Sequence, residues 1–345
     1  MSSRKRCAWH QFAPHTVGLA MQPTRRVPAA LPMLILPKPV EDEFVLGYIG
    51  RLTHVNLSSS CFETMCRLVV HFNLDQDYTP LRGQYYQAES HLDALALTSG
   101  KTVGELIRYH TNFDAEGLTP DVVARWLYCL MRRRKVSKQY PESKPPYLCR
   151  ECIPQQVRDV GFSFWHRQHQ LDGLYWCPVH RTALLAVDDW LTKDALIPVA
   201  TAASVRTPTT AKDFDTYPVL QSFCEMMMGF LRHPLWMSVA RIEDCLRRRA
   251  VERGLSLGAG DVAREPNDSL FLNDLAFNEC PAWWLDEVFG MRKATADKSR
   301  IALNSVFSGG GFAPPVSYAL AIALLLSPRE RADILDGSSP SSGRV

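Results

Sequence analysis

Four residues of the chain have the types and the spacing of a zinc site. Cys149 and Cys152 form a Cys-x-x-Cys pair, and after 24 intervening residues Cys177 and His180 form a Cys-x-x-His pair. Three thiolates and one imidazole are donors that Zn²⁺ binds tetrahedrally. Because four protein ligands leave no position for a reactive water, such a site is structural and not hydrolytic. The sequence therefore predicts one structural zinc ion.

The residues around this group leave two alternatives open. His166 and His169 lie in the intervening loop and could replace a ligand, although the neighbouring Phe162, Phe164 and Trp165 favour packing or surface roles. Seven of the ten cysteines lie outside the group, so a chance match of spacing is the second alternative.

No motif of a known catalytic site accompanies these residues. The segment Ser99-Gly100-Lys101-Thr102 ends like a phosphate-binding loop, but Leu95 stands where that loop needs its first glycine. The sequence has no H-E-x-x-H, no H-x-E paired with P-C-x-x-C and no G-x-S-x-G. We therefore expect a protein without enzymatic activity, with a nuclease built from scattered carboxylates as the alternative.

Length and composition predict a globular protein of more than one domain. The chain has 345 residues, of which 46% are hydrophobic and 22% charged. Its net charge of +3 is too small for a nucleic-acid-binding field over the whole surface, so any such contact must come from local patches. The longest plain apolar stretch, residues 318–326, is far shorter than the roughly 20 residues of a membrane span. We expect an intracellular protein with no membrane partner.

Helical patterns occupy most of the chain before the zinc motif. Phe44, Tyr48, Leu52 and Val55 recur on one helix face. Ser60 and Glu63 have the spacing of a capping box, and Phe62, Met65, Cys66 and Val69 form the stripe behind it. His91, Ala94, Leu95 and Leu97 then lead into a Ser99-Gly100-Lys101 turn, a second capping box at Thr102 and Glu105, and a further helix. This is the outline of a helix-turn-helix. Thr119-Pro120 predicts the start of another helix, over 122–130.

Helical patterns return in the C-terminal third. They cover 219–231, 242–253 up to Gly254, 270–289 with a break at Pro281, and 317–326. The fold class expected is mainly α: a helical N-terminal domain with a helix-turn-helix-like unit, an embedded Cys₃His zinc finger and a helical C-terminal domain. The expected boundaries are an extended lead-in (1–36), the N-terminal domain (37–145), the zinc finger (146–190), a linker (191–216), the C-terminal domain (217–335) and a disordered tail (336–345).

Basic side chains mark candidate contacts with nucleic acid or a partner. Solvated helix faces and helix ends are the simpler explanation for these charges. The candidates are Lys101, Arg108, Arg132, Arg133, Arg134, Lys135, Arg167, Arg247, Arg248 and Arg249.

The segment from Tyr147 to Leu185 resembles the zinc-finger core of the TniQ family. The resemblance is carried by the four predicted ligands, by Phe164-Trp165-His166-Arg167, by His169-Gln170-Leu171 and by Leu184-Leu185. Upstream, Glu43 to Asn56 and Leu97 to Gly100 resemble the family's N-terminal helical portion, so the resemblance spans about 38–190. Arg150 and His169 depart from it, because they stand where Pro and Trp are usual, and a second pair of cysteine knuckles is missing. We expect Trp165 and Leu171 to pack beside the metal.

The resemblance implies a non-catalytic adaptor of transposition. Such a protein engages the target site, either through DNA or through a CRISPR effector with its guide RNA, and recruits an AAA+ ATPase that regulates the transposase. A stand-alone sequence-specific DNA-binding protein that marks the attachment site is the alternative. A homodimer stays open as an assembly state. The implied location is the bacterial cytoplasm, in association with the nucleoid.

Overall fold

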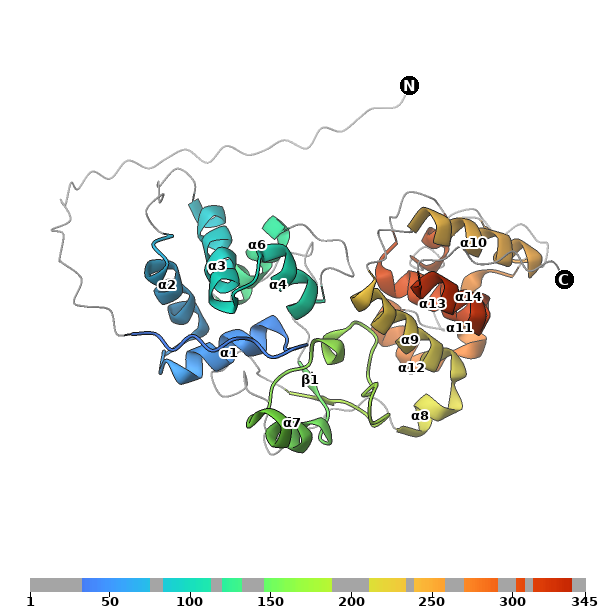
Figure 1. The fold of residues 1–345 in the computed structure, drawn as a ribbon. Coiled ribbons are helices and arrows are strands. Elements are labelled where there is room, and N and C mark those ends of the chain that lie inside the picture. Colours follow the sequence, from blue (N-terminus) through green and yellow to red (C-terminus); the bar gives the residue numbers. More distant parts are fainter. Residues whose placement is uncertain are drawn as a thin grey trace, which may run out of the picture. The chain divides into compact units, whose positions relative to one another are not determined.

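The structure, a computed structural model, describes residues 33–74, 83–112, 120–131, 146–187, 211–233, 239–257, 270–290, 302–307 and 313–336. These residues are mainly helical, as the sequence predicts (Figure 1). Several predicted features lie outside the described residues. They are the lead-in up to residue 32, the basic run 132–135, most of the linker and the tail from 337 onward.

The N-terminal helices are α1 (Val45–Val55), α2 (Cys61–His71), α3 (Gly83–Ser99), α4 (Val103–His110) and α6 (Pro120–Met131). Phe44, Tyr48 and Leu52 of the predicted α1 face are buried, whereas Val55 at its end is half-buried. The Ser60 side chain caps α2 by accepting from the Glu63 N–H. The Glu63 carboxylate, however, accepts from the Ser59 N–H at 2.7 Å and so caps one residue earlier than the motif predicts.

The predicted turn between α3 and α4 forms at Gly100. This residue has φ +70°, a conformation that glycine adopts without steric cost, and its N–H donates to the Leu97 carbonyl. Thr102 and Glu105 then form the reciprocal capping box that starts α4. The Leu97 side chain, on the last turn of α3, is 51% exposed. The α3–turn–α4 unit is thus a helix-turn-helix outline with one apolar residue on its outer face.

The segment between the helical parts contains two short strands and one helix. Strand β1 (Tyr147–Leu148) pairs antiparallel with β2 (Leu185–Ala186), with Tyr147 opposite Ala186 and Leu148 opposite Leu185. Helix α7 (Cys152–Val160) ends at Gly161, which has φ +84°, and a 3₁₀ turn, η1, covers Arg167–Gln170. The two strands hold the ends of the segment together and return the chain to its starting point.

The C-terminal helices surround α13 (Pro315–Leu325), which is buried on nearly every side. The others are α8 (Ala211–Thr216), α9 (Pro218–Arg232), α10 (Val239–Glu252), α11 (Leu272–Glu279), α12 (Ala282–Phe289), the 3₁₀ helix η5 (Ala302–Phe307) and α14 (Pro328–Leu335). The break at Pro281 and the stop at Gly254 are confirmed. Three of these C-terminal elements, η5 and two α-helices, were not predicted from the sequence. Helix α8 lies inside the predicted linker, and α14 was not predicted although Ser327 and Glu330 form its capping box.

Two hydrophobic cores result, and the segment 146–187 contributes to both. The N-terminal core gathers side chains of α1, α2, α3, α4 and α6 and includes Trp165. The C-terminal core gathers side chains of α9 to α14 and includes Leu171, Leu174 and Trp176. None of the helices that the structure describes is both long and apolar enough to cross a bilayer.

Candidate metal centre

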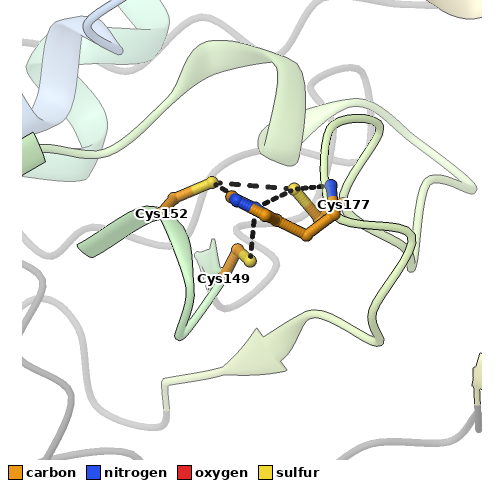
Figure 2. A group of neighbouring side chains, drawn as sticks. Cys149, Cys152 and Cys177 are labelled. Atoms are coloured by element: carbon orange, nitrogen blue, oxygen red, sulfur yellow. Dashed lines mark hydrogen bonds between the residues drawn. The ribbon is translucent and has the colours of Figure 1, made fainter. Parts of the chain in front are cut away.

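The four predicted ligands converge on one point. The donor atoms of Cys149, Cys152, Cys177 and His180 all lie within 4.8 Å of one another. His180 Nδ1 lies 3.5 Å from the Cys149 sulfur, 3.3 Å from that of Cys152 and 3.5 Å from that of Cys177. The Cys152 and Cys177 sulfurs are 3.6 Å apart, and Figure 2 shows the three thiols turned toward one another. Within the described parts of the chain, this is the one group with the donors and the spacing for a metal ion.

These distances fit a tetrahedral zinc ion and exclude a disulfide. With Zn–S near 2.3 Å and Zn–N near 2.0 Å, the edges of a Cys₃His tetrahedron are about 3.5–3.8 Å long. The S–S bond of a disulfide is only about 2.05 Å, and the three cysteines are free. The donor chemistry and the geometry therefore agree, and the group could bind one metal ion with no coordination position left for water.

The local fold explains how residues so far apart in the sequence meet. Cys149 directly follows β1, and Cys152 is the first residue of α7. Cys177 lies in a tight turn, in which its N–H donates to the Thr182 carbonyl and its own carbonyl accepts from the Arg181 N–H, both at 2.8 Å. Arg181 has φ +56°, which lets this turn present His180 to the sulfurs. Pairing of β1 with β2 brings the two halves together.

The electrostatics of the group favour one thiolate before any ion binds. Hydrogen bonds from Cys152, then from Cys177, lower the pKa of the Cys149 thiol far below its ordinary value. The same contacts raise the pKa of Cys152 and Cys177, because those thiols keep the protons that they donate. The N-terminus of α7 also favours negative charge at Cys152. A bound cation would release the remaining thiol protons, so metal affinity should rise with pH.

Neighbouring polar groups orient the ligands. The backbone N–H of His180 donates to the Cys177 sulfur at 3.4 Å, and the Thr182 hydroxyl lies 3.5 Å from the Cys149 sulfur. Such outer contacts fix the direction of the ligand lone pairs and stabilise thiolate charge. Sequence reasoning missed Thr182, because a threonine near a ligand pair carries no signal of its own.

The two histidines of the loop are not part of the group. His169 is buried, and its Nε2 has no hydrogen-bond partner among the described residues. Burial, together with the charge of His166, lowers the pKa of His169 to about 3. The His166 ring meets the His169 ring edge to face, at 5.0 Å between ring centroids, and its Nδ1 lies 3.5 Å from the Asp42 carboxylate. His169 therefore has the packing role, which is one of the two roles, packing or surface, that the sequence favours for these histidines.

The expectation that Trp165 and Leu171 pack beside the metal is wrong. Trp165 lies in the N-terminal core, where a Cβ on Gly47 of α1 would come within 2.7 Å of its Cδ1. Leu171 lies in the C-terminal core. The residues that pack with the cysteines are instead Leu184 and the partly buried Tyr147. The aromatic residues of the loop therefore attach the metal centre to the two cores rather than shield it.

Arg167 is an internal link and not a free contact residue. Its side chain is largely buried, and its Nε donates to Asp42 at 2.6 Å. Its Nη1 donates to the Arg108 carbonyl at the end of α4. The backbone N–H of Phe44 also donates to the Trp165 carbonyl at 2.7 Å. The candidate role of Arg167 in binding a partner does not fit this burial, and no signal in the sequence points to Asp42.

The other predicted contact residues divide into two groups. Arg247 bonds the Phe307 carbonyl and Asp244, and Arg249 bonds Glu330 and Glu252, so both hold the C-terminal helices together. Lys101, Arg108 and Arg248 form no such links with the residues that the structure describes, and Arg108 and Arg248 are exposed. Arg132, Arg133, Arg134 and Lys135 lie outside the described residues.

Two glutamines that the sequence reading did not single out as site residues brace the loop. The Gln156 side chain accepts from the Phe164 N–H and donates to the Phe164 carbonyl, at 3.1 and 3.0 Å. Gln170 makes the same pair of bonds to the backbone of Tyr147, at 3.0 and 2.9 Å. Each side-chain amide makes the pair of hydrogen bonds that a neighbouring strand would otherwise make to that residue. The loop between the two ligand pairs is therefore held in place without additional β-sheet.

The described chain is mainly helical, and the segment that carries the closed Cys₃His group contributes side chains to both hydrophobic cores, which is the class of protein that fold and site indicate. The sequence model of the TniQ family matches residues 34–184, a range that contains the N-terminal helices and all four ligands. Residues 34–184 are thus a TniQ domain, and the resemblance is confirmed. TniQ proteins are a non-catalytic accessory family of transposition that serves target selection. No curated protein matches the chain in a sequence comparison.

Proposed function

We propose that this protein is a non-catalytic adaptor for selecting the target site of a transposon. In this proposal it engages the target site, through DNA or through a CRISPR effector with its guide RNA, and recruits an AAA+ regulator of transposition. The TniQ match over 34–184 is the observation that carries the proposal. The closed ligand set supports it, since a zinc ion with four protein ligands has no position to activate water. The corresponding location is the bacterial cytoplasm, with the nucleoid.

The contacts of the metal centre support a role as a structural support for other elements rather than as an independent zinc finger. Its loop contributes Trp165 to one core and Leu171 to the other, so both helical parts are attached to one small rigid element. The Trp284 Nε1 adds a hydrogen bond to the Gly173 carbonyl at 2.9 Å. An adaptor needs surfaces held in fixed relation, and a structural ion at this position would stabilise both attachments.

A transposition assay in cells tests this proposal. Cys177→Ala, which removes one ligand, should abolish both zinc content and transposition, and Cys66→Ala, a cysteine outside the group, should leave both intact. Pull-down of the AAA+ regulator by the wild-type chain, and its loss with Cys177→Ala, tests recruitment. Transposition at the wild-type level with metal-free Cys177→Ala protein would overturn the proposal.

A stand-alone sequence-specific DNA-binding protein is the second candidate. The helix-turn-helix outline of α3 and α4, with Lys101 and Arg108 on its surface, favours it. A gel shift with purified chain, attachment-site DNA and random DNA separates the two. Tight binding to one sequence without an effector favours the DNA reader, whereas weak binding that salt removes favours the adaptor. Light scattering of the same sample gives the assembly state.

A further inference from the structure

The outer surface of α4 carries cations around an exposed aromatic ring. The Tyr109 side chain is 44% exposed. Both neighbouring cations make cation–π contacts with this ring: the Lys101 ammonium lies over it at 5.5 Å from its centre, and the Arg108 guanidinium at 5.6 Å. Lys38 extends to the turn before α4, where its Nζ lies 3.5 Å from the Thr98 carbonyl. We call Lys38, Lys101, Arg108 and Tyr109 the α4 cluster.

The cations of the α4 cluster form no direct ion pair among the described residues, but Lys101 acts on one carboxylate. Hydrogen bonds from Thr102 and, to a smaller extent, the charge of Lys101 lower the pKa of Glu105. The acid nearest along α4, Glu105, is occupied in the capping box, where it accepts from the Thr102 N–H and hydroxyl at 2.8 Å. Burial lowers the pKa of His110, and the charges of Lys101 and Arg167 lower it further, whereas the contact with the Glu43 carbonyl and the charge of Asp42 act in the opposite direction. Only Lys38 has an internal role, since a cation beside the last carbonyls of α3 is favourable.

The backbone beneath the cluster is fixed. Buried Arg167 donates to the Arg108 carbonyl, and His110 Nδ1 lies 2.8 Å from the Glu43 carbonyl. The Thr111 hydroxyl closes the helix by donating to the Ile107 carbonyl at 2.6 Å. The exposed side chains thus stand on a rigid helix end, which reduces the entropy lost when a ligand orders them.

We propose that the α4 cluster binds single-stranded nucleic acid, with an unpaired base stacked on Tyr109 and the neighbouring phosphates held by Lys101 and Arg108. Base stacking on aromatic rings combined with a cationic surface is the chemistry by which proteins hold single strands. A duplex offers phosphates but keeps its base faces stacked, so it would use the cations and not the ring. An acidic peptide likewise gives the ring no flat partner.

This inference deepens the proposed function, because it names the kind of ligand that the N-terminal helices engage. It also connects that ligand to the metal centre. Arg167, which anchors α4, lies in the loop between the two ligand pairs. Loss of the metal should therefore weaken nucleic-acid binding even though no ligand residue touches the strand.

Fluorescence anisotropy with the zinc-loaded full chain tests the proposal. The probes are labelled oligo(dT) and oligo(rU), which separate DNA from RNA as the source, and a duplex of equal length. We expect single strands to bind more tightly than the duplex. Tyr109→Ala should weaken single-strand binding by roughly 5- to 150-fold, and Tyr109→Phe, which keeps the ring, should bind like wild type. Lys101→Ala and Arg108→Ala should each reduce the salt slope by about 0.7.

Arg158→Ala is the matched control, because Arg158 is an exposed arginine on α7 and its loss changes the net charge equally. It should have a smaller effect than Arg108→Ala. Circular dichroism confirms that each variant is folded. Unchanged affinity of Tyr109→Ala, tighter binding of the duplex, or no binding at low salt would each overturn the inference. Because no transposition partner is present, such a failure would leave the proposed function untouched.

Discussion

At the scale of single residues, the donor set and its environment decide what the metal centre does. Cys149, Cys152, Cys177 and His180 were found from spacing alone, since two short ligand pairs are a local signal. Arg167 was misread, because its partner Asp42 lies 125 positions earlier in the chain. A charge that looks free in the sequence can be neutralised by any distant carboxylate, and only the fold reveals which.

Removal of one ligand should unfold the metal centre. Zinc binding contributes on the order of 10–16 kcal/mol to small metal domains, which exceeds the roughly 5–15 kcal/mol that stabilises a typical domain. We therefore expect Cys177→Ala to contain no zinc by mass spectrometry and to lose helical signal in circular dichroism. Cys66→Ala, as in the transposition assay, is the matched control. One equivalent of zinc in Cys177→Ala would contradict the ligand assignment.

Buried His169 should make the protein acid-sensitive. Its pKa is about 3 in the folded state, against about 6.5 when unfolded, so the unfolded state binds more protons between these values. Its contribution to stability is therefore complete above pH 6.5 and falls as the pH decreases toward 3, by about 1.4 kcal/mol per pH unit.

Urea unfolding at pH 7.5 and 5.5 measures this effect. His169→Gln should lose less stability between the two values than wild type does. The comparison of the two proteins removes the effect of thiol protonation, which is common to both. An equal loss in wild type and in His169→Gln would show that His169 does not titrate in this way.

At the scale of elements, short-range signals predicted where helices begin and end but not what they touch. The turn at Gly100, the stop at Gly254 and the break at Pro281 were each visible in the sequence. Helix α14 has an equally clear capping box at Ser327, yet its eight residues carry too weak an apolar pattern to stand out. Leu97 lies at a position that fits the helical pattern of the sequence, and its exposure follows only from how α3 packs in the fold.

Two helical glycines form a matched pair for testing how α1 meets the metal loop. A Cβ on Gly47 would lie 2.7 Å from Trp165 Cδ1, whereas a Cβ on Gly104 of α4 would meet nothing within 4 Å. Gly47→Ala should lower the free energy of unfolding by about 1–3 kcal/mol, because Trp165 must shift. Gly104→Ala should raise it by about 0.4–1 kcal/mol through reduced chain entropy in the unfolded state.

Thermal or urea unfolding of both variants gives the comparison. If Gly47→Ala were as stable as Gly104→Ala, the close contact between α1 and Trp165 would not exist in solution. Zinc content should remain at one equivalent in both variants, since neither glycine touches a ligand.

At the scale of the whole molecule, one small loop takes part in two cores. Between its ligand pairs the chain sends Trp165 into the N-terminal core and Leu174 and Trp176 into the C-terminal core. This explains why the loop is longer than in most zinc ribbons. The sequence showed the aromatic residues but not their destinations, because an apolar side chain does not specify which core it joins.

Metal removal should accordingly loosen both cores. In hydrogen exchange after treatment with a zinc chelator, we expect faster exchange in α1, which packs on Trp165, and in α12, whose Trp284 bonds Gly173. Both effects should disappear when zinc is restored. Faster exchange confined to residues 149–180 would show that the finger is an independent unit and not a link.

X-ray absorption at the zinc edge of the purified full chain tests the central claim most directly. We expect one zinc ion per chain, with three sulfur ligands near 2.3 Å and one nitrogen ligand near 2.0 Å. A chain that is folded without metal, or a zinc shell containing oxygen from water, would contradict it.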